Sequence, residues 1–323
     1  MMLEKETCMA VSLKGRSLLT LKDFSPEEIR YLLDLSHRVK KERRDGLFHQ
    51  RFKGRTLAMI FEKRSTRTRC AFETAFGEEG GHPVFLSTQD IQLGSKESVE
   101  DTARVLGRMF DCIEFRGFKQ QTVETLASYS GVPVYNGLTD SYHPTQALAD
   151  VMTLEERFGD VRGLSLCFVG DGRNNVAVSL MIISSKLGIH FTIVAPESLF
   201  PGEELVKTCT EYADESKARI KISTALESVH GADAIYTDVW ASMGEEAKQA
   251  ERERLLRPYQ VNSALMHRTG KSITVFLHCL PAVKEQEVTT EVIEGEQSVV
   301  WDEAENRKHT IKALMLATLG VER

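Results

Sequence analysis

The stretch LAMIFEKRSTRTR, residues 57–69, joins a short apolar run to a cluster of four cations and three hydroxyls. Leu57 to Phe61 has the length and composition of a buried strand. Residues 66–77 have the spacing of an amphipathic helix. A buried strand that leads directly into a helix is the repeating unit of a parallel α/β sheet. This stretch therefore predicts the fold class.

The beginning of that helix is a predicted anion site. The unpaired backbone N–H groups and the helix dipole favour negative charge at this end. Arginine adds a planar pair of donors that matches the oxygens of a phosphate. A solvated basic turn, with Ser65 only capping the helix, is the alternative. We expect a phosphate group at residues 62–69.

The alternation of short apolar runs and amphipathic segments extends along most of the chain. A first helix is expected after Ser25, which with Glu28 forms the pattern of a capping box. Further strands are expected at residues 84–86, 113–115, 132–135, 164–169, 191–195, 234–237 and 273–277, with helices at 98–109, 121–129, 144–158, 175–187 and 303–319. This predicts an α/β fold with two doubly wound domains, each a parallel sheet flanked by helices. The domains are expected at residues 1–150 and 151–302, with the C-terminal helix, residues 303–323, packing back on the first domain.

Composition excludes several classes of protein. A chain of 323 residues suits two domains. The formal charge of -6 disfavours nucleic acid binding. Six scattered cysteines without a CxxC pair predict reduced thiols and no metal site. The charged N-terminus and the absence of an 18-residue apolar run predict a cytoplasmic protein without a membrane partner.

Two further polar clusters follow predicted strands, where ligands bind in open α/β sheets. Arg116 follows the strand at 113–115, and His143-Pro144-Thr145-Gln146 precedes a helix. Together with Ser-Thr-Arg-Thr-Arg at 65–69, these residues resemble the motifs of the aspartate and ornithine carbamoyltransferases. The resemblance runs from about Leu18 to the C-terminus.

The resemblance implies how the donor, carbamoyl phosphate, is bound. The phosphate is expected at the helix N-terminus, and Thr68, Arg116 and His143 are expected to act on the carbonyl oxygen as an oxyanion hole. Gln146 offers an acceptor for the carbamoyl NH2. The implied donor-site residues are Ser65, Thr66, Arg67, Thr68, Gln92, Arg116, His143, Gln146, Cys279, Leu280 and Arg307. Read alone, His143 could cap a helix, Gln146 could be exposed, and Arg116 and Arg307 could be surface arginines.

The acceptor is indicated by clusters in the second half of the chain. Gly170-Asp171-Gly172-Arg173-Asn174-Asn175 lacks the third glycine of a dinucleotide loop. The Asp238 to Gly244 segment and His278-Cys279-Leu280-Pro281 resemble the ornithine branch of the family. That resemblance implies ornithine contacts from Asn175, Asp238, Ser242 and Met243, and catalytic roles for Arg67, Arg116, His143, Asp238 and Cys279.

The activity implied by the resemblance is a carbamoyl transfer in arginine metabolism. The uncharged δ-amine of L-ornithine would attack carbamoyl phosphate through a tetrahedral intermediate, giving L-citrulline and phosphate without a cofactor. Gln92 and Lys96 resemble a loop that family members lend to a neighbouring subunit, which implies a homotrimer or a multiple of trimers. The alternatives are a carbamoyltransferase for putrescine, aspartate or an acylated ornithine, a nicotinamide-dependent oxidoreductase, and a homologue that binds carbamoyl phosphate without catalysis.

Overall fold

The first sheet is built from four parallel strands. The computed structural model describes residues 11–87, 91, 97–241 and 249–322. The strand order is β2-β1-β3-β4, so the chain starts in the interior and adds strands on both sides. Its elements are α1 (Pro26–Arg44), β1 (Thr56–Phe61), α2 (Thr66–Gly77), β2 (His82–Ser87), α3 (Val99–Met109), β3 (Cys112–Arg116), α4 (Gln120–Ser130) and β4 (Val134–Leu138).

The second sheet is built in the same way from five parallel strands. Its order is β7-β6-β5-β8-β9, with β5 in the centre. Its elements are β5 (Ser165–Val169), α6 (Asn175–Leu187), β6 (His190–Val194), α7 (Glu203–Ser216), β7 (Ile220–Ser223), β8 (Ala234–Tyr236), α8 (Gln249–Leu256), α9 (Ser263–Arg268), β9 (Val275–Leu277) and α10 (Thr290–Ile293). The predicted α/β fold with two doubly wound sheets is confirmed.

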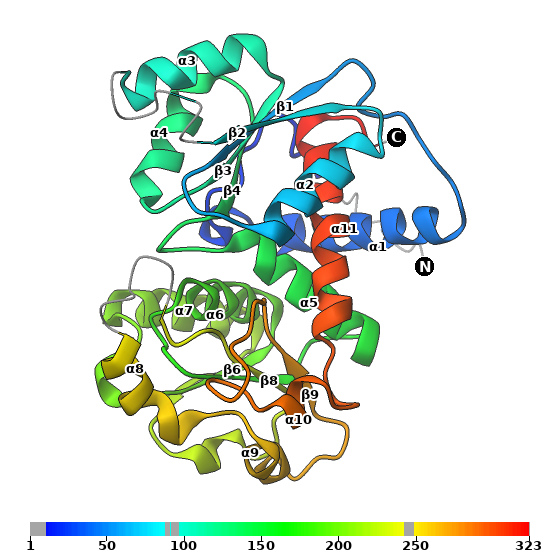
Figure 1. Ribbon diagram of the computed structural model, residues 1–323. Helices are drawn as coiled ribbons and strands as arrows, with labels where there is room; N and C mark the ends of the chain where they lie inside the picture. The colour runs from blue at the N-terminus through cyan, green and yellow to red at the C-terminus, as the bar shows by residue number, and fades with distance from the viewer. Residues whose placement is uncertain (1–10, 88–90, 92–96, 242–248, 323) are drawn as a thin grey trace, which may run out of the picture.

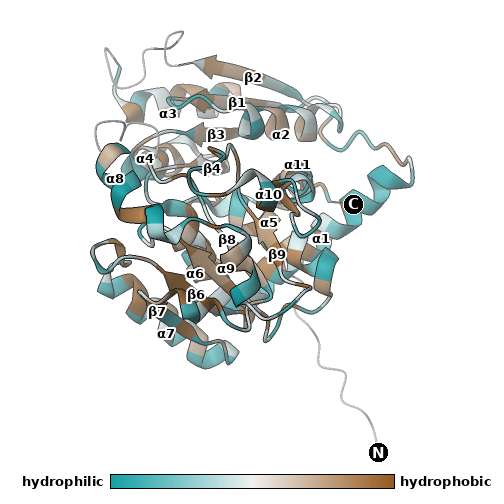
Figure 2. Ribbon diagram, turned by 60° about the horizontal axis from the view of Figure 1, so that its bottom comes forward, coloured by the Kyte–Doolittle hydropathy of each residue, from teal (hydrophilic) through white to brown (hydrophobic). Residues whose placement is uncertain are grey.

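Two helices connect the sheets. The helix α5 (Pro144–Phe158) leads from the first sheet to the second, and α11 (Val300–Leu319) returns to pack against α1, α2 and α5 (Figure 1). The C-terminal helix thus packs back on the first domain, as predicted. One hydrophobic cluster includes Phe72 beside the first sheet and Phe168 in the second. The strands of both sheets are largely hydrophobic in Figure 2, whereas α1 carries many hydrophilic residues.

Several boundaries differ from the predicted ones. The strand β4 covers residues 134–138 and not 132–135, because Pro133 has no N–H for the ladder and the buried Asn136 pairs with Phe115 of β3. The strand β9 begins at Val275, since Ile273 is exposed. Both α7 and the edge strand β7 were missed. No residue of β7 is fully buried, which weakens the apolar pattern that identifies a strand.

The capping box predicted at the start of α1 is present. Ser25 Oγ accepts a hydrogen bond from the backbone N–H of Glu28, and a carboxylate oxygen of Glu28 accepts one from the backbone N–H of Ser25. Among the helices that the structure describes, none is both long and apolar enough to cross a membrane.

Candidate active site

The predicted phosphate site lies where β1 and β3 end side by side. Ser65 caps α2, and its Oγ accepts a hydrogen bond of 3.2 Å from the backbone N–H of Thr68. In the parallel register Phe61 lies opposite Arg116, so the end of β3 is next to the start of α2. Arg116 Nη1 donates to Thr68 Oγ1 at 3.2 Å. The sheet therefore brings together two motifs that are about fifty positions apart in the chain.

His143 joins this group from the N-terminus of α5. Its side chain is buried and makes no capping hydrogen bond, so the structure rules out the alternative of a capping histidine. Its backbone N–H donates to Ser179 Oγ of α6 at 2.8 Å, which ties the first turn of α5 to the second domain. Nδ1 of His143 is buried and has no hydrogen-bond partner among the described residues.

Arg307 reaches the same place from α11. It is buried, and its Nη2 donates weakly to Thr68 Oγ1 at 3.4 Å and to Thr145 Oγ1 at 3.3 Å. Its Nη1 donates to Gln146 Oε1 at 2.6 Å. Arg307 and Arg116 are therefore not the exposed surface arginines that were considered as alternatives.

These residues line one cavity together with residues from the second domain. It is closed on the donor side by α2, β3, α5 and α11, and on the other side by the ends of β8 and β9. Predicted site residues that line it are Ser65, Arg67, Thr68, Arg116, His143, Asn175, Asp238, Cys279, Leu280 and Arg307. Residues that were not predicted are Lys63, Leu138, Val176, Val239, Ala241 and Pro281.

The donor side of the cavity is strongly cationic. Burial and, to a smaller extent, the nearby guanidinium of Arg307 lower the pKa of Arg116 to about 10. Burial also lowers the pKa of Arg67. The pKa of His143 is held well below its usual value by burial and by the charges of Arg307, Arg116 and Arg67. A neutral imidazole beside three guanidiniums can donate a hydrogen bond to an anion without carrying a charge itself.

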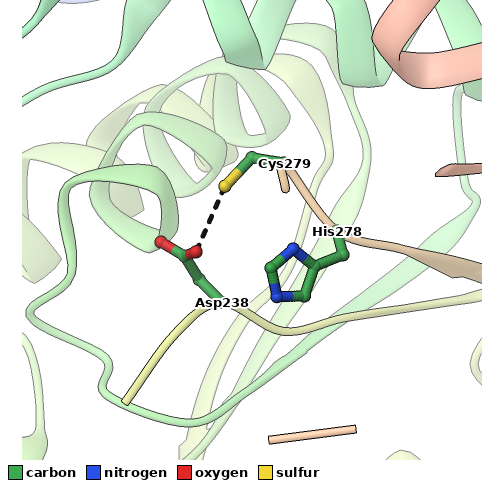
Figure 3. A group of neighbouring side chains, drawn as sticks. All are labelled: Asp238, His278 and Cys279. Carbon is green, nitrogen blue, oxygen red and sulfur yellow. Dashed lines mark hydrogen bonds between the residues drawn. The ribbon is translucent and has the colours of Figure 1, made fainter. Parts of the chain in front are cut away.

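On the acceptor side, Asp238 and Cys279 point toward one another (Figure 3). The thiol Sγ of Cys279 donates to Asp238 Oδ1 at 3.1 Å, and Asn174 Nδ2 donates to Asp238 Oδ2 at 2.8 Å. Burial and the carboxylate of Asp238 hold the pKa of Cys279 well above its usual value. Cys279 is therefore a thiol that donates a hydrogen bond, and not a thiolate nucleophile.

His278, which the sequence analysis did not assign to the site, supports the turn that carries Cys279. Its Nδ1 accepts a hydrogen bond of 2.8 Å from the backbone N–H of Leu280, and its Nε2 lies 3.3 Å from Glu287 Oε1. Leu280 has φ of 57°, a conformation that a leucine adopts only when its surroundings hold it. The signal for His278 was its place in the quoted His-Cys-Leu-Pro motif.

Asp238, His278 and Cys279 also form a group whose possible metal-ligand atoms lie within 4.8 Å of one another. Both ring nitrogens of His278 already have hydrogen-bonding neighbours, in the backbone of Leu280 and the carboxyl of Glu287. A metal ion would have to displace one of them. This arrangement fits support of the turn better than metal binding.

Lys63 lines the cavity and, like His278, was quoted in a sequence motif without being given a role. Its side chain is almost fully buried, and its Nζ lies 2.5 Å from Asp140 Oδ1 and 4.4 Å from the ring centroid of Phe118. It adds a fourth cation to the donor side, with its charge partly offset by Asp140. Its position within residues 62–69 was the available signal.

Some predicted residues are not part of the cavity. Thr66 lines a neighbouring hollow with Arg69 and Cys70. Gln146 is buried behind Arg307, to which it offers its carbonyl oxygen. Asn175 lines the cavity, but its Nδ2 donates to the carbonyl oxygen of Thr139 at 2.6 Å, and it is Asn174 that caps α6. Gln92, Lys96, Ser242 and Met243 lie outside the described residues.

Glu114 lies directly behind this site, two residues before Arg116 on β3. It is fully buried, and neither carboxyl oxygen has a hydrogen-bond partner in the described part of the chain. A Cβ at Gly137 would come within 2.0 Å of its Oε1, which explains the glycine in β4. Burial raises the pKa of Glu114 well above 4.5, although Arg116 and Arg307 act in the opposite direction.

Replacing Glu114 by glutamine, which needs no proton to be neutral, is expected to stabilise the protein near neutral pH by about 1–3 kcal/mol, since each pH unit of a linked pKa shift corresponds to about 1.4 kcal/mol. Because the folded pKa is raised, the folded protein keeps a proton that the unfolded chain releases above pH 4.5. Stability is therefore lost as pH rises from that value. Urea unfolding at pH 5 and pH 8 tests this. If the gain in unfolding free energy of Glu114→Gln over the wild type is not larger at pH 8 than at pH 5, the raised pKa of Glu114 is contradicted.

Comparisons with known proteins agree on one family. The family described as "Aspartate/ornithine carbamoyltransferase, carbamoyl-P binding domain" matches residues 16–156, and "Aspartate/ornithine carbamoyltransferase, Asp/Orn binding domain" matches residues 162–318. The chain is 69% identical to an ornithine carbamoyltransferase of Caldanaerobacter subterraneus subsp. tengcongensis, covering 96% of this chain and all of the relative. It is 54% identical to a catabolic ornithine carbamoyltransferase of Bacillus licheniformis, covering 96% and 98%. The solved ornithine carbamoyltransferase of Pyrococcus furiosus superposes with a TM-score of 0.93 at 47% identity, covering 96% and 99%.

Proposed function

This chain belongs to the aspartate/ornithine carbamoyltransferase family, and we propose that it transfers the carbamoyl group of carbamoyl phosphate to the δ-amine of L-ornithine, giving L-citrulline and phosphate. One observation carries the proposal. A single cavity has arginines and a neutral histidine on one side, and a carboxylate hydrogen-bonded to a thiol on the other. These are the groups that a phosphorylated donor and an amine acceptor require.

The donor half suits a phosphate attached to a carbonyl group. Arg67, Ser65 and the backbone N–H groups that begin α2, that of Thr66 included, bind the phosphate in this proposal. Thr68, Arg116 and His143 face the carbonyl oxygen, where negative charge develops during the transfer. Each donor of such an oxyanion hole typically contributes about 3–4 kcal/mol to the lowering of the barrier. Arg307 completes the set and donates to the carbonyl oxygen of Gln146, so Gln146 acts on the donor through Arg307.

The acceptor half of the cavity suits a substrate whose side chain ends in an amine. The carboxylate of Asp238 attracts the ammonium group of ornithine, and Cys279 and Asn174 keep that carboxylate in place. The backbone carbonyl of Leu280 faces the carbamoyl NH2 in this proposal. Asn175, Ser242 and Met243 bind the amino-acid end of ornithine, as the family resemblance implies.

The reaction then proceeds in two steps. The uncharged δ-amine attacks the carbonyl carbon, a C–N bond forms, and the oxygen becomes an oxyanion held by Arg116, His143 and Thr68. The C–O bond to phosphate breaks, and the leaving phosphate takes the proton that the amine loses. An alkyl amine has a pKa of about 10, so kcat/KM for ornithine should increase with pH above neutrality.

Two alternatives fit the geometry less well. Aspartate as acceptor would bring its carboxylates toward Asp238, which would repel them. A nicotinamide cofactor would need the glycines after β5 to approach a pyrophosphate. Gly172 instead packs inside the protein, because a Cβ there would come within 2.9 Å of Ile193 and of the Leu199 carbonyl.

A direct assay tests the proposed function. The purified protein is expected to form citrulline from carbamoyl phosphate and L-ornithine, with kcat/KM in the range of about 10⁴–10⁸ M⁻¹s⁻¹ that is usual for enzymes. Parallel reactions contain L-aspartate or putrescine in place of ornithine. Preference for either of these acceptors, or no citrulline, would reject the proposal.

The remaining assignments follow from the same family. Residues 1–150 with 303–323 are proposed to bind carbamoyl phosphate, and residues 151–302 to bind ornithine. The packing of α11 on α1 and α2, and the contact of Arg307 with Thr68, support this division. A homotrimer, or a multiple of trimers, that shares Gln92 between subunits, a cytoplasmic location and the absence of a cofactor are further predictions.

A further inference from the structure

At the back of the cavity lies a buried polar cluster, of which the proposed mechanism uses only Arg307 and, through it, Gln146. It consists of Gln146 and Asp150 on α5, Tyr236 at the end of β8, and Glu303 and Arg307 on α11. All five side chains are buried. Asp150 and Glu303 do not line the cavity. Burying two carboxyl groups in one cluster destabilises the folded state unless the charge is neutralised and the oxygens accept hydrogen bonds.

The carboxyl groups of Asp150 and Glu303 accept hydrogen bonds from the same side chains. The amide Nε2 of Gln146 donates to Asp150 Oδ1 and to Glu303 Oε1, at 2.8 Å in both cases. The hydroxyl of Tyr236 donates to Glu303 Oε1 at 3.0 Å and lies 3.5 Å from Asp150 Oδ1. The backbone N–H of His278 donates to Glu303 Oε2 at 3.0 Å. Glu303 thus receives a donor on each oxygen.

Asp150 differs from Glu303 in this respect. Its Oδ2 is buried and receives no hydrogen bond from any described residue. An ionised Asp150 would leave this oxygen charged and without a donor, whereas a protonated Asp150 is itself a donor, and its hydrogen-bond contact with the Glu303 carboxylate lowers the pKa of Glu303. Because carboxylates this close cannot both be charged, the arrangement fits a protonated Asp150 beside an ionised Glu303.

The charges around the pair favour the same assignment. Burial and the charge of Glu303 hold the pKa of Asp150 well above its usual value. Burial also raises the pKa of Glu303, but the hydrogen bonds from Asp150, the His278 backbone and Tyr236 act to lower it. The charged or titratable groups that face the pair are Arg307, Tyr236, His278 and Cys279.

The pair contacts both halves of the site. On the donor side, Gln146 accepts a hydrogen bond from Arg307, which reaches Thr68. On the acceptor side, Tyr236 is two residues before Asp238, and His278 is next to Cys279. One buried pair is therefore linked to the residues that hold the donor and to the strand ends that hold the acceptor.

We propose that Asp150 and Glu303 share one proton, and that this pair positions Arg307 and Gln146 against the donor and the ends of β8 and β9 against the acceptor. Neither residue touches a substrate; both are positioning residues. The inference rests on the proposed carbamoyl transfer for its effect on catalysis, but the shared proton itself does not depend on any substrate.

Two amide substitutions separate the roles of the two residues. In Asp150→Asn the amide NH2 can replace the protonated Oδ2 and the carbonyl oxygen can replace Oδ1. In Glu303→Gln the new NH2 group replaces one of two oxygens that accept hydrogen bonds. In one orientation of the amide it faces the donors of Gln146 and Tyr236, and in the other it faces the backbone N–H of His278. We expect Glu303→Gln to lower kcat/KM for both substrates at least about tenfold more than Asp150→Asn does. Glu305→Gln, on the same helix with a half-exposed side chain, is the matched control and should stay near wild type.

The loss in Glu303→Gln should appear in kcat as well as in the KM of both substrates, because each half of the site moves. Equal losses in the two variants, or a greater loss in Asp150→Asn, would overturn the assignment of the proton. Circular dichroism and thermal unfolding establish that each variant is folded. If Glu303→Gln does not fold, Asp150→Asn still gives a decision, because a loss of more than about tenfold in that variant contradicts a protonated Asp150.

An infrared spectrum tests the proton without any activity. At pH 7 the protein should show the C=O band of a buried carboxylic acid that Asp150→Asn lacks. The measurement is made in proteins that also carry Glu114→Gln, because Glu114 is itself held neutral. An unchanged band in Asp150→Asn would reject the shared proton. Citrulline formation by the wild-type protein, assayed in parallel, shows separately whether the proposed function holds.

Discussion

Arg67→Ala is expected to lower kcat/KM for carbamoyl phosphate by about 10²–10³-fold, the effect typical of removing one transition-state donor. Arg67 is in the first turn of α2 and lines the cavity. Its side chain makes no hydrogen bond or ion pair with another residue in the ranges that the structure describes. Its donors are therefore free for the phosphate. Arg116 and Arg307, in contrast, already contact Thr68.

Steady-state kinetics with each substrate varied in turn measure this effect. The KM of ornithine should change much less than that of carbamoyl phosphate. Arg67→Lys should recover part of the activity, since it restores the charge but not the planar pair of donors. Arg104→Ala, the same change on an exposed part of α3, serves as the control. Near-normal kinetics of Arg67→Ala would remove Arg67 from the donor site.

Asp238→Asn is expected to lower kcat/KM for ornithine by about a hundredfold, because it removes the carboxylate that faces the amine and disturbs the Cys279 contact. The KM of carbamoyl phosphate should change less, since Asp238 hydrogen-bonds to Asn174 and Cys279 and to no residue of the donor side in the described part of the chain. Cys279→Ser keeps a hydrogen-bond donor to Asp238, and its kcat/KM for ornithine should therefore fall less than that of Asp238→Asn.

The comparison of these two variants measures what the charge itself contributes. If Asp238→Asn and Cys279→Ser lose the same activity, the role of Asp238 is only to hold the turn. An unchanged ornithine KM together with full kcat in Asp238→Asn would remove Asp238 from the acceptor site altogether.

The donor half of the site was the part most open to prediction from sequence. The anion site proposed at residues 62–69 could be predicted from these residues alone, because a helix N-terminus with arginines favours an anion wherever it occurs. Arg116 and His143 follow predicted strands, and parallel strands end at the same edge of their sheet. Their convergence on the cavity that Thr68 also lines therefore follows from the fold class.

The cluster behind the cavity was not predictable in the same way. Asp150 lies in the middle of a helical pattern, and Glu303 near the start of another, where acidic residues are usually exposed. Tyr236 lies in a short apolar segment that predicts an ordinary strand. Only the packing of α11 against α5 and against the end of β9 makes these side chains buried neighbours.

Gln146 shows the same limit within a motif that was recognised. The sequence placed it beside the donor and left open whether it was exposed. In the structure its amide connects Arg307 to the two buried acids. A motif specifies the type of side chain, but its hydrogen-bond partners come from other segments of the chain.

The amino-acid sequence by itself predicted the alternation of strands and helices, apart from α7 and β7, an anion site at Ser65 to Arg69 and, through the resemblance, the nature of the donor. These depend on local periodicity and on the chemistry of neighbouring residues. The tertiary structure decided which charges are neutralised, which histidine nitrogen is unpaired and how Asp150 and Glu303 meet. Such properties depend on burial and on contacts between residues more than a hundred positions apart, which no local pattern contains.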